Sequence, residues 1–330
     1  MERKISKTNR LMNIIVTGCA GFIGFHLCLF LLKKKFNIYG IDNLNEYYDV
    51  NLKKNRLKIL KEFKNFYFHK THIENKKIFK KYERANINII INLAAQAGVR
   101  HSLKDPYSYV NSNLLGHVNM LELARYLKVK KFIYASSSSV YGGNKILPFS
   151  VSQRVDNPVS IYAASKKSGE LISESYSHLF GIQCIGLRFF TVYGPWGRPD
   201  MALFKFTKKI ISGKKIELFN KGKHQRDFSF IDDVADSIFK IILKPPKGKI
   251  PFRAVNIANG KSKKLKEYLK LLEKNLNIKS KIKKLPMQKG DVKKTHANII
   301  QLKKLIKANP KTSIDVGVQK FVKWYRNFYK

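Results

Sequence analysis

A glycine-rich turn between a short apolar run and an apolar helix is the feature that most constrains the fold of this chain. The segment TGCAGFIG places Gly18, Gly21 and Gly24 three residues apart, after a predicted strand at Asn13–Thr17 and at the start of a predicted helix over residues 22–32. Glycines at such a turn let the backbone approach a diphosphate closely, and the helix N-terminus offers N–H groups to its oxygens. The segment therefore predicts a dinucleotide site.

An acidic residue strengthens this prediction and narrows it to one dinucleotide. Asp42 ends the next predicted strand, Asn37–Asp42, about 20 residues after the turn, where a carboxylate can accept hydrogen bonds from a ribose diol. A negative charge there repels the additional phosphate of NADP. We therefore predict NAD as the cofactor.

The same turn begins a regular alternation of strand-like and helix-like segments. Helical segments separate the strands, and we expect one long helix to start at Asp105 and Pro106. The alternation indicates an α/β fold, a Rossmann doubly wound parallel sheet with right-handed crossovers. The further short apolar runs typical of buried strands lie at residues 87–93, 131–135 and 183–188.

After about residue 190 the alternation becomes less regular. We expect short strands at residues 227–231 and 255–257 in this part of the chain. We also expect a helix over residues 262–276, capped by Ser262, and a last helix over residues 316–329. This mixture predicts a smaller α/β unit that follows the Rossmann sheet.

Three segments make up the predicted domain organisation. Residues 1–11 form an N-terminal basic extension, which would be a disordered tail, or would precede the true start if Met12 rather than Met1 initiates the chain. Residues 12–190 form the NAD-binding Rossmann domain. Residues 191–330 form the smaller C-terminal α/β substrate domain, and some of its segments are expected to return to the Rossmann sheet.

Composition limits the classes of protein to consider. The formal net charge is +43, from 65 Lys and Arg against 22 Asp and Glu. The excess positive charge is mostly Lys, and it occurs together with many Asn and Ile residues. All three residue types have A/T-rich codons, so we interpret the charge as compositional drift on solvent-exposed faces of the protein. The alternative is a functional attraction of the protein to a polyanion. No run of about 18 apolar residues predicts a membrane span, and no secretory signal is evident. Three cysteines without metal-ligand spacing favour a reduced, cytoplasmic protein.

A tyrosine and a lysine one helical turn apart are the candidate catalytic pair. Tyr162 and Lys166 lie in SIYAASKKSGE, on a predicted helix that follows a strand ending in four serines, residues 136–139. Positions i and i+4 share one face of a helix, and a Rossmann domain binds its nicotinamide beyond the carboxyl ends of its strands. Alone, the spacing is more often an ordinary half-buried Tyr beside a solvated Lys. To act as a base, Tyr162 would need its pKa lowered from near 10 by roughly 3 units, or about 4 kcal/mol.

Together these motifs resemble those of the extended short-chain dehydrogenase/reductases that act on nucleotide sugars. The segments GIDNLNEYYDVNLKKNRL, NLAAQAGVRHS, PVSIYAASKKSGEL, LRFFTVYGPWGRPDMALFKF, RDFSFIDD and FVKWYRNFY are similar to those of UDP-glucuronate 4-epimerases. The resemblance implies an isomerase that uses tightly bound, recycled NAD to epimerise a UDP-sugar through a transient 4-keto intermediate. It also implies a homodimer, with no nucleic-acid, membrane or metal partner.

The resemblance further implies a role for individual residues. Tyr162 would be the general base, Lys166 its electrostatic partner and ribose ligand, and Ser137 the hydroxyl that links the sugar to the tyrosine. The implied cofactor contacts are Gly18, Gly21, Phe22, Ile23, Gly24, Asp42, Asn43, Ile73, Leu93, Ala94, Ala95, Tyr162 and Lys166. The implied substrate contacts are Arg100, Ser137, Ser138, Ser139, Thr191, Arg198, which would hold the sugar carboxylate with Ser139, and Arg226, which would bind the UDP diphosphate.

Two positions depart from the family pattern, and three alternatives stay open. His72 replaces the family's Asp before Ile73, which removes a carboxylate expected beside the adenine, and Lys289 replaces a Pro. One alternative is a UDP-glucuronate decarboxylase, although such enzymes usually carry Glu in place of Ser139. Another is a 4-epimerase of a different UDP-sugar. The third is a basic binding protein that keeps a Rossmann shell without turnover.

Overall fold

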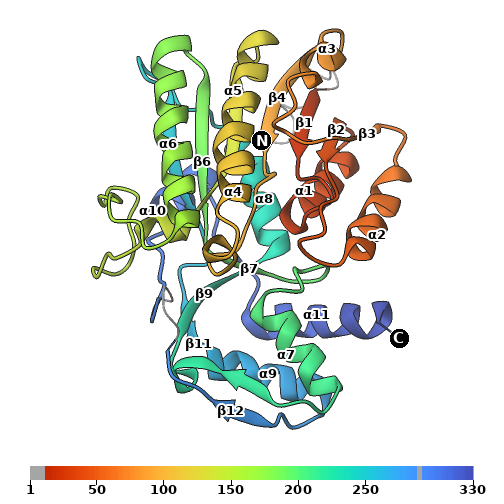
Figure 1. The fold of residues 1–330 in the computed structure, drawn as a ribbon, viewed down its shortest axis with the longest axis vertical. Coiled ribbons are helices and arrows are strands. Elements are labelled where there is room, and N and C mark those ends of the chain that lie inside the picture. The colour runs from red at the N-terminus through yellow and green to blue at the C-terminus, as the bar shows by residue number, and fades with distance from the viewer. Residues whose placement is uncertain (1–11, 288–291, 330) are drawn as a thin grey trace.

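The computed structural model describes residues 12–287 and 292–329. Its centre is a seven-stranded sheet in the order β10-β6-β5-β4-β1-β2-β3, in which every neighbouring pair is parallel (Figure 1). This order confirms the predicted doubly wound sheet. The strands are β1 (Asn13–Thr17), β2 (Asn37–Asp42), β3 (Phe66–Lys70), β4 (Ile87–Asn92), β5 (Lys131–Ser137), β6 (Gln183–Phe189) and β10 (Phe252–Ile257).

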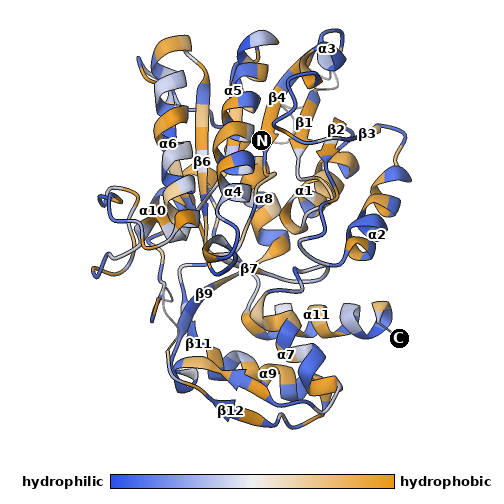
Figure 2. Cartoon of the chain, viewed as in Figure 1, coloured by the Kyte–Doolittle hydropathy of each residue, from blue (hydrophilic) through white to orange (hydrophobic). Residues whose placement is uncertain are grey.

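Helices cover both faces of the sheet because successive strand residues point to opposite sides. In β1, Ile14 and Val16 join the core shared with α1, α2 and α8, whereas Ile15 joins a second core shared with α3 and α5. Figure 2 shows hydrophobic residues concentrated in the sheet and on the helix faces turned toward it. The helices around this sheet are α1 (Phe22–Lys33), α2 (Val50–Lys61), α3 (Ile78–Tyr82), α4 (Tyr107–Tyr109), α5 (Gly116–Tyr126), α6 (Ile161–Phe180) and α8 (Ile231–Ile242).

A smaller lobe lies beyond the carboxyl ends of the sheet strands, at the bottom of Figure 1. It contains a three-stranded sheet, β11-β9-β7, and a two-stranded sheet, β12-β8. The chain also returns from this part to the main sheet, where β10 pairs with β6. The remaining elements are β7 (Thr191–Tyr193), α7 (Ala202–Ile211), β8 (Ile216–Leu218), β9 (Gln225–Phe230), β11 (Ser262–Lys264), α9 (Leu265–Leu276), β12 (Ile282–Lys284), α10 (Ile300–Ile306) and α11 (Ile314–Phe328).

Of two expected helix starts, one differs from the structure and one agrees with it. The prediction that Ser262 caps a helix is wrong, because residues 262–264 form β11 and pair antiparallel with β9, so α9 begins at Leu265. The helix expected to start at Asp105 and Pro106 does start there, with Asp105 Oδ1 accepting from the Ser108 N–H at 3.2 Å. It passes through a π-helical segment, Val110–Leu115, before α5. Short 3₁₀ turns lie at His101–Leu103, Ser138–Tyr141 and Phe219–Gly222.

Candidate active site

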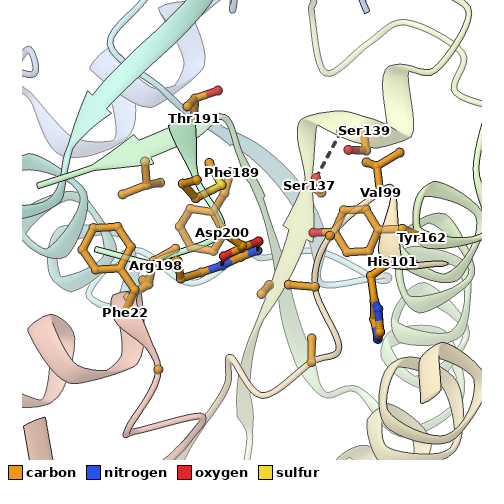
Figure 3. A pocket seen from close by; sticks show the side chains of 18 of the residues that line it. Phe22, Val99, His101, Ser137, Ser139, Tyr162, Phe189, Thr191, Arg198 and Asp200 are labelled. Atoms are coloured by element: carbon orange, nitrogen blue, oxygen red, sulfur yellow. Dashed lines mark hydrogen bonds and ion pairs between the residues drawn. The ribbon is translucent and has the colours of Figure 1, made fainter. Parts of the chain in front are cut away.

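A cavity of about 950 Å³ lies between the carboxyl ends of the main sheet and the smaller lobe. All the residues that the sequence suggested for cofactor or substrate contact line it, although they come from positions 18 to 226 of the chain. Figure 3 shows Tyr162 and Ser137 on one side of this space, with Arg198 and Asp200 facing them. The fold therefore brings the predicted site residues together; their individual roles stay predictions.

The glycine-rich turn forms one wall of the cavity and has no room for side chains. Gly18 has a φ of +69°, and a Cβ added to it would lie 2.8 Å from the Ala94 backbone nitrogen. A Cβ on Gly24 would lie 2.0 Å from the Gly18 carbonyl oxygen. No side chain caps the start of α1, so the first N–H groups of this helix are available to an anion at its positive end. This arrangement fits a dinucleotide diphosphate.

Asp42 is held at the end of β2 by backbone N–H groups. Its carboxylate accepts from the Ala20 N–H at 3.1 Å and from the Leu44 N–H at 2.9 Å. Burial raises the pKa of Asp42, and these two N–H groups and the charge of Lys53 oppose that rise. Lys53, on α2, also lines the cavity, and its Nζ donates to both oxygens of Asn45 at 2.6 Å. Sequence reasoning missed this cation because it lies on the next helix and not directly after Asp42.

The departure at His72 changes the same wall of the cavity. The side chain of His72 is exposed, and its Nδ1 lies 3.4 Å from Asn43 Nδ2. Ile73 is buried and lines the cavity with Glu74. His72 therefore stands where the family pattern has an Asp, and the carboxylate that lines this part of the cavity is that of Glu74, two residues later. The other departure, Lys289, lies outside the described residues, as does the extension 1–11.

The candidate catalytic helix, α6, is fixed at its first turn by Ser160, whose Oγ accepts from the Ala163 N–H at 3.1 Å. Lys166 is buried, and its Nζ donates to the Ala135 carbonyl at 2.9 Å and lies 6.0 Å from the centre of the Tyr162 ring. Burial lowers the pKa of Lys166 to about 8. The ammonium is thus held at the end of β5, near the tyrosine ring.

The protein groups alone do not give Tyr162 the low pKa that a base requires. Burial raises the pKa of Tyr162, while hydrogen bonding with Ser137 and the charge of Arg198 lower it, and the net shift is upward. Among the protein groups, Ser137 and Arg198 lower the pKa of Tyr162, and the role of Lys166 as its electrostatic partner stays a prediction. Ser137 lies at the end of β5, and its Oγ accepts from the Ser139 N–H at 3.1 Å (Figure 3); its link between the sugar and the tyrosine stays a prediction.

The four serines have different environments. Ser136 also lines the cavity, but its hydroxyl is engaged, donating to Glu170 Oε1 at 2.6 Å. Glu170 in turn forms a buried two-point ion pair with Arg188, at 2.8 Å for each contact. Serines 137–139 line the cavity, where their hydroxyls can meet a substrate. The buried pair fixes α6 against β5 and β6 and thereby sets the distance between the tyrosine and these serines.

Arg198 lies in the cavity with a partner that the sequence did not suggest. Its Nε donates to Asp200 Oδ1 at 3.0 Å, and its Nη2 donates to Asp200 Oδ2 at 2.6 Å. Tyr47 Oη also donates to Asp200 Oδ2 at 3.2 Å. Burial favours a raised pKa for Asp200, but the charge and hydrogen bonds of Arg198 outweigh it, so the pKa of Asp200 is lowered. Tyr47 and Asp200 are 153 residues apart, and no sequence signal joins them. For the ion pair of Arg198 with Asp200, the sequence signal was the acidic residue in GRPD, two positions after the arginine.

The other predicted substrate contacts lie toward the smaller lobe. Arg100 stacks over the Phe219 ring at 5.3 Å, and Arg226 Nη1 donates to the Gln225 carbonyl at 2.9 Å. Thr191 begins β7, which runs parallel to β9. Aromatic and basic side chains that the sequence analysis did not single out complete this end of the cavity: Phe189, Phe206, Phe219, Phe228, Tyr268, Lys104, Lys205 and Lys209.

Comparison with known proteins agrees with this geometry. Residues 14–258 match the family described as the NAD dependent epimerase/dehydratase family. The chain is 47% identical over 316 residues to an uncharacterised protein of Methanocaldococcus jannaschii, covering 95% of this chain and 96% of that protein. It is 41% identical to a probable UDP-glucuronate 4-epimerase of Rhizobium meliloti, covering 97% and 98%. The crystal structure of UDP-glucuronic acid 4-epimerase from Bacillus cereus, with UDP-glucuronic acid and NAD, matches with 33% identity and a TM-score of 0.90, covering 96% and 100%.

The fold and the site define a Rossmann protein of the extended short-chain dehydrogenase/reductase type. More particularly, the chain belongs to the NAD-dependent epimerase/dehydratase family. The predicted NAD cofactor and nucleotide-sugar epimerase class are confirmed at the level of this family and its relatives. Within residues 12–287 and 292–329, no helix is both long and apolar enough to cross a membrane, and no three His, Cys, Asp or Glu side chains are grouped to hold a metal.

Proposed function

We propose that this protein is a UDP-glucuronate 4-epimerase that interconverts UDP-glucuronate and UDP-galacturonate. The observation that carries the proposal is the convergence of Tyr162, Ser137 and Arg198 on one cavity that the glycine-rich turn also lines. A base, a bridging hydroxyl and a cation for the uronate then surround the space beside a dinucleotide site. Near-full-length relatives and a solved structure with both ligands support the same reaction.

The residues supply proton transfer and orientation. NAD, when bound, supplies reversible hydride acceptance, so the reaction needs no net oxidant and the cofactor is recycled without leaving. Tyr162 removes the proton from the sugar 4-hydroxyl, directly or through Ser137, as the C4 hydrogen leaves as hydride. The transient 4-keto sugar, held by its UDP, then presents its other face, and Tyr162 returns the proton to O4 when the hydride returns to C4.

The pKa of Tyr162 has to fall in the loaded enzyme. Burial keeps it raised in the protein alone. A positive charge beside the phenol favours its ionised form, and the oxidised nicotinamide is such a charge. Arg198 already acts in this direction. We propose that Lys166 contributes mainly by holding the ribose of the cofactor, since its Nζ lies at the Ala135 carbonyl.

Arg198 and Ser139 would keep the uronate carboxylate in place. A 4-keto uronic acid is a β-keto acid and loses CO₂ readily when its carboxylate is free to rotate. A two-point or charge-assisted contact restricts that rotation. This favours epimerisation over the decarboxylase alternative, and Ser139 in place of a Glu acts in the same direction.

A substrate comparison tests the proposal against the alternative epimerases. Purified protein should be given UDP-glucuronate, UDP-glucose, UDP-N-acetylglucosamine and its uronic acid separately, with the 4-epimer of each measured by chromatography. We expect turnover of UDP-glucuronate to exceed that of the neutral sugars by at least about 10-fold, the lower limit for a lost charge-assisted contact. Faster turnover of a neutral UDP-sugar would overturn the assignment.

We also infer that the protein acts as a homodimer. The outer faces of α4, the π-helical segment and α6 expose large apolar side chains: Tyr107, Val110, Leu115, Leu171 and Leu179. A second copy that packs on this face would cover them. Sedimentation of wild type and Leu171→Glu should show a dimer and a monomer respectively. Ile282→Glu, on exposed β12, is the control and should stay dimeric; a monomeric wild type would refute this inference.

We propose a cytoplasmic location on the state of the cysteines. Cys19, Cys28 and Cys184 are all buried and free. Burial raises the pKa of each thiol, so none is activated toward disulfide exchange. Three unpaired thiols are typical of a protein that works in a reducing compartment.

A further inference from the structure

A fully buried arginine on α2 joins the glycine-rich turn to the loop that carries Arg198. Arg56 Nη1 donates to the carbonyl of Ala20, inside the turn, at 2.7 Å. Arg56 Nη2 donates to the Trp196 carbonyl at 2.5 Å and lies 3.4 Å from the Gly197 carbonyl. Trp196 and Gly197 directly precede Arg198. One guanidinium thus contacts a carbonyl of the glycine-rich turn and two carbonyls of the loop that carries Arg198.

Ion pairing does not account for this buried charge. The exposed fraction of Arg56 is 0%. Over the described part of the chain, no carboxylate forms a salt bridge with it within 4.0 Å. Its acceptors are backbone carbonyls and Tyr48 Oη, at 2.8 Å from Nη1. Burying a cation without an anion is costly unless dipoles replace its water, so an apolar side chain would serve packing better. Because this burial is costly, we infer that the rigid, planar set of N–H donors of the guanidinium is needed to bridge the carbonyl groups that it contacts.

The loop before Arg198 is held in a conformation that it would not adopt freely. Trp196 has a φ of +58°, in the left-handed region that disfavours residues with a Cβ. Besides Arg56, two residues of α1 hold this loop: His26 Nε2 donates to the Pro195 carbonyl at 2.9 Å, and the Phe25 ring lies 5.6 Å from that of Trp196. Because α1 begins at the glycine-rich turn, every anchor named here connects the loop to the dinucleotide wall.

We propose that Arg56 is a positioning residue that sets Arg198 against the sugar by fixing its loop to the glycine-rich turn. This inference rests on the proposed uronate contact of Arg198. When the guanidinium of Arg56 is absent, the Trp196 carbonyl loses its donor and the strained loop relaxes. Arg198 then shifts relative to Tyr162, so discrimination for the uronate falls although Arg56 touches neither ligand.

The test compares affinities for UDP-glucuronate and UDP in Arg56→Met, Arg56→Lys, Arg198→Gln and the double variant Arg56→Met/Arg198→Gln, all as NAD-loaded protein. The ratio of the two affinities isolates the sugar contact from UDP binding and from overall stability. Arg56→Met should reduce this ratio by about 3- to 30-fold, the range for residues that act through a neighbour. Arg56→Lys should restore little, because an ammonium cannot bridge two carbonyl groups in a fixed plane.

The double variant and a control decide how Arg56 acts. If it acts through Arg198, Arg56→Met should not lower the ratio further in the Arg198→Gln background. The control is Arg326→Met, because Arg326 also donates to a backbone carbonyl, that of Leu276 at 2.6 Å, but lies outside the cavity; its ratio should equal that of wild type.

Three outcomes are distinguishable. A lower melting temperature of Arg56→Met or Arg56→Lys with an unchanged ratio would show a purely structural role and overturn the inference. Equal losses of ratio for Arg56→Met in both backgrounds would also overturn it, because the effect would bypass Arg198. An unchanged ratio in Arg198→Gln alone would instead refute the uronate contact on which the inference rests.

Discussion

Arg198 and Asp200 hold each other in a two-point ion pair inside the cavity, with contacts of 3.0 and 2.6 Å. The pair has little net charge, so it cannot attract a uronate over a long range. A guanidinium has five N–H groups, and Asp200 occupies two positions, Nε and Nη2. The proposed contact with the sugar carboxylate therefore depends on hydrogen-bond geometry. It uses the N–H groups of Arg198 that do not bond Asp200.

Replacing Arg198 should weaken the sugar and spare the nucleotide. Hydrogen bonds to a charged group contribute about 1.5–3 kcal/mol, so Arg198→Gln or Arg198→Ala should bind UDP-glucuronate roughly 10- to 150-fold more weakly, with little change for UDP. The freed 4-keto intermediate should also lose CO₂ and give some 4-ketopentose or xylose product. Calorimetry with both ligands and product analysis of the same samples measure this. Equal weakening of both ligands without decarboxylated product would leave uronate selection to Ser138, Ser139 and Thr191.

Removing the Tyr162 hydroxyl should stop the chemistry and leave binding intact. We expect Tyr162→Phe to lose at least about 10²-fold in turnover, because a positioned acid–base group contributes about 10²–10⁴-fold. Its affinities for UDP and NAD should match those of wild type, measured by calorimetry. Near-normal epimerisation by this variant would show that another group is the base.

Cofactor choice should follow the carboxylate of Asp42. Protein freed of dinucleotide and reconstituted with NAD should be clearly more active than the same protein with NADP, because the carboxylate repels the added phosphate. Equal activity with the two cofactors would speak against the role of Asp42.

The buried ammonium of Lys166 should make the dinucleotide-free protein gain stability at alkaline pH. Its pKa falls from 10.5 to about 8 on folding, so between these values the folded protein binds fewer protons than the unfolded chain. The contribution of this group to the free energy of unfolding therefore rises with pH across that window, by about 3 kcal/mol. Denaturant unfolding of wild type and Lys166→Met from pH 7 to 10.5 should show the free energy of unfolding of wild type rising relative to that of the variant. A constant difference would mean that the lysine is not buried as a cation.

The sequence predicted the sheet well because its signals are local. Asn13–Thr17 and Asn37–Asp42 are short apolar runs bounded by polar or glycine residues, and both coincide with the observed strands. Ser262 misled because a serine before a helical pattern is an ordinary cap signal. The residues at 262–264 instead pair with β9, and no local pattern shows that a partner strand is present.

The candidate site was predictable only where a motif carried it. Gly18, Tyr162 and the serines belong to patterns with a fixed spacing. Asp200 was missed although Arg198 is only two residues away, because no local pattern shows that this pair meets Tyr47, 153 residues away. Arg56 was missed because its partner Trp196 lies 140 residues away. A charged residue on a chain with 65 Lys and Arg carries no mark of burial, and only the fold reveals that Arg56 is enclosed.

The most direct test of the central claim is the product that the purified protein forms from UDP-glucuronate with no NAD added. Proton NMR of the sugar distinguishes C4 epimers and detects loss of C6. The account predicts UDP-galacturonate that approaches equilibrium with the substrate, many turnovers per protein, and no requirement for added cofactor. UDP-xylose or a 4-ketopentose as the main product, or no turnover by protein that retains NAD, would contradict it.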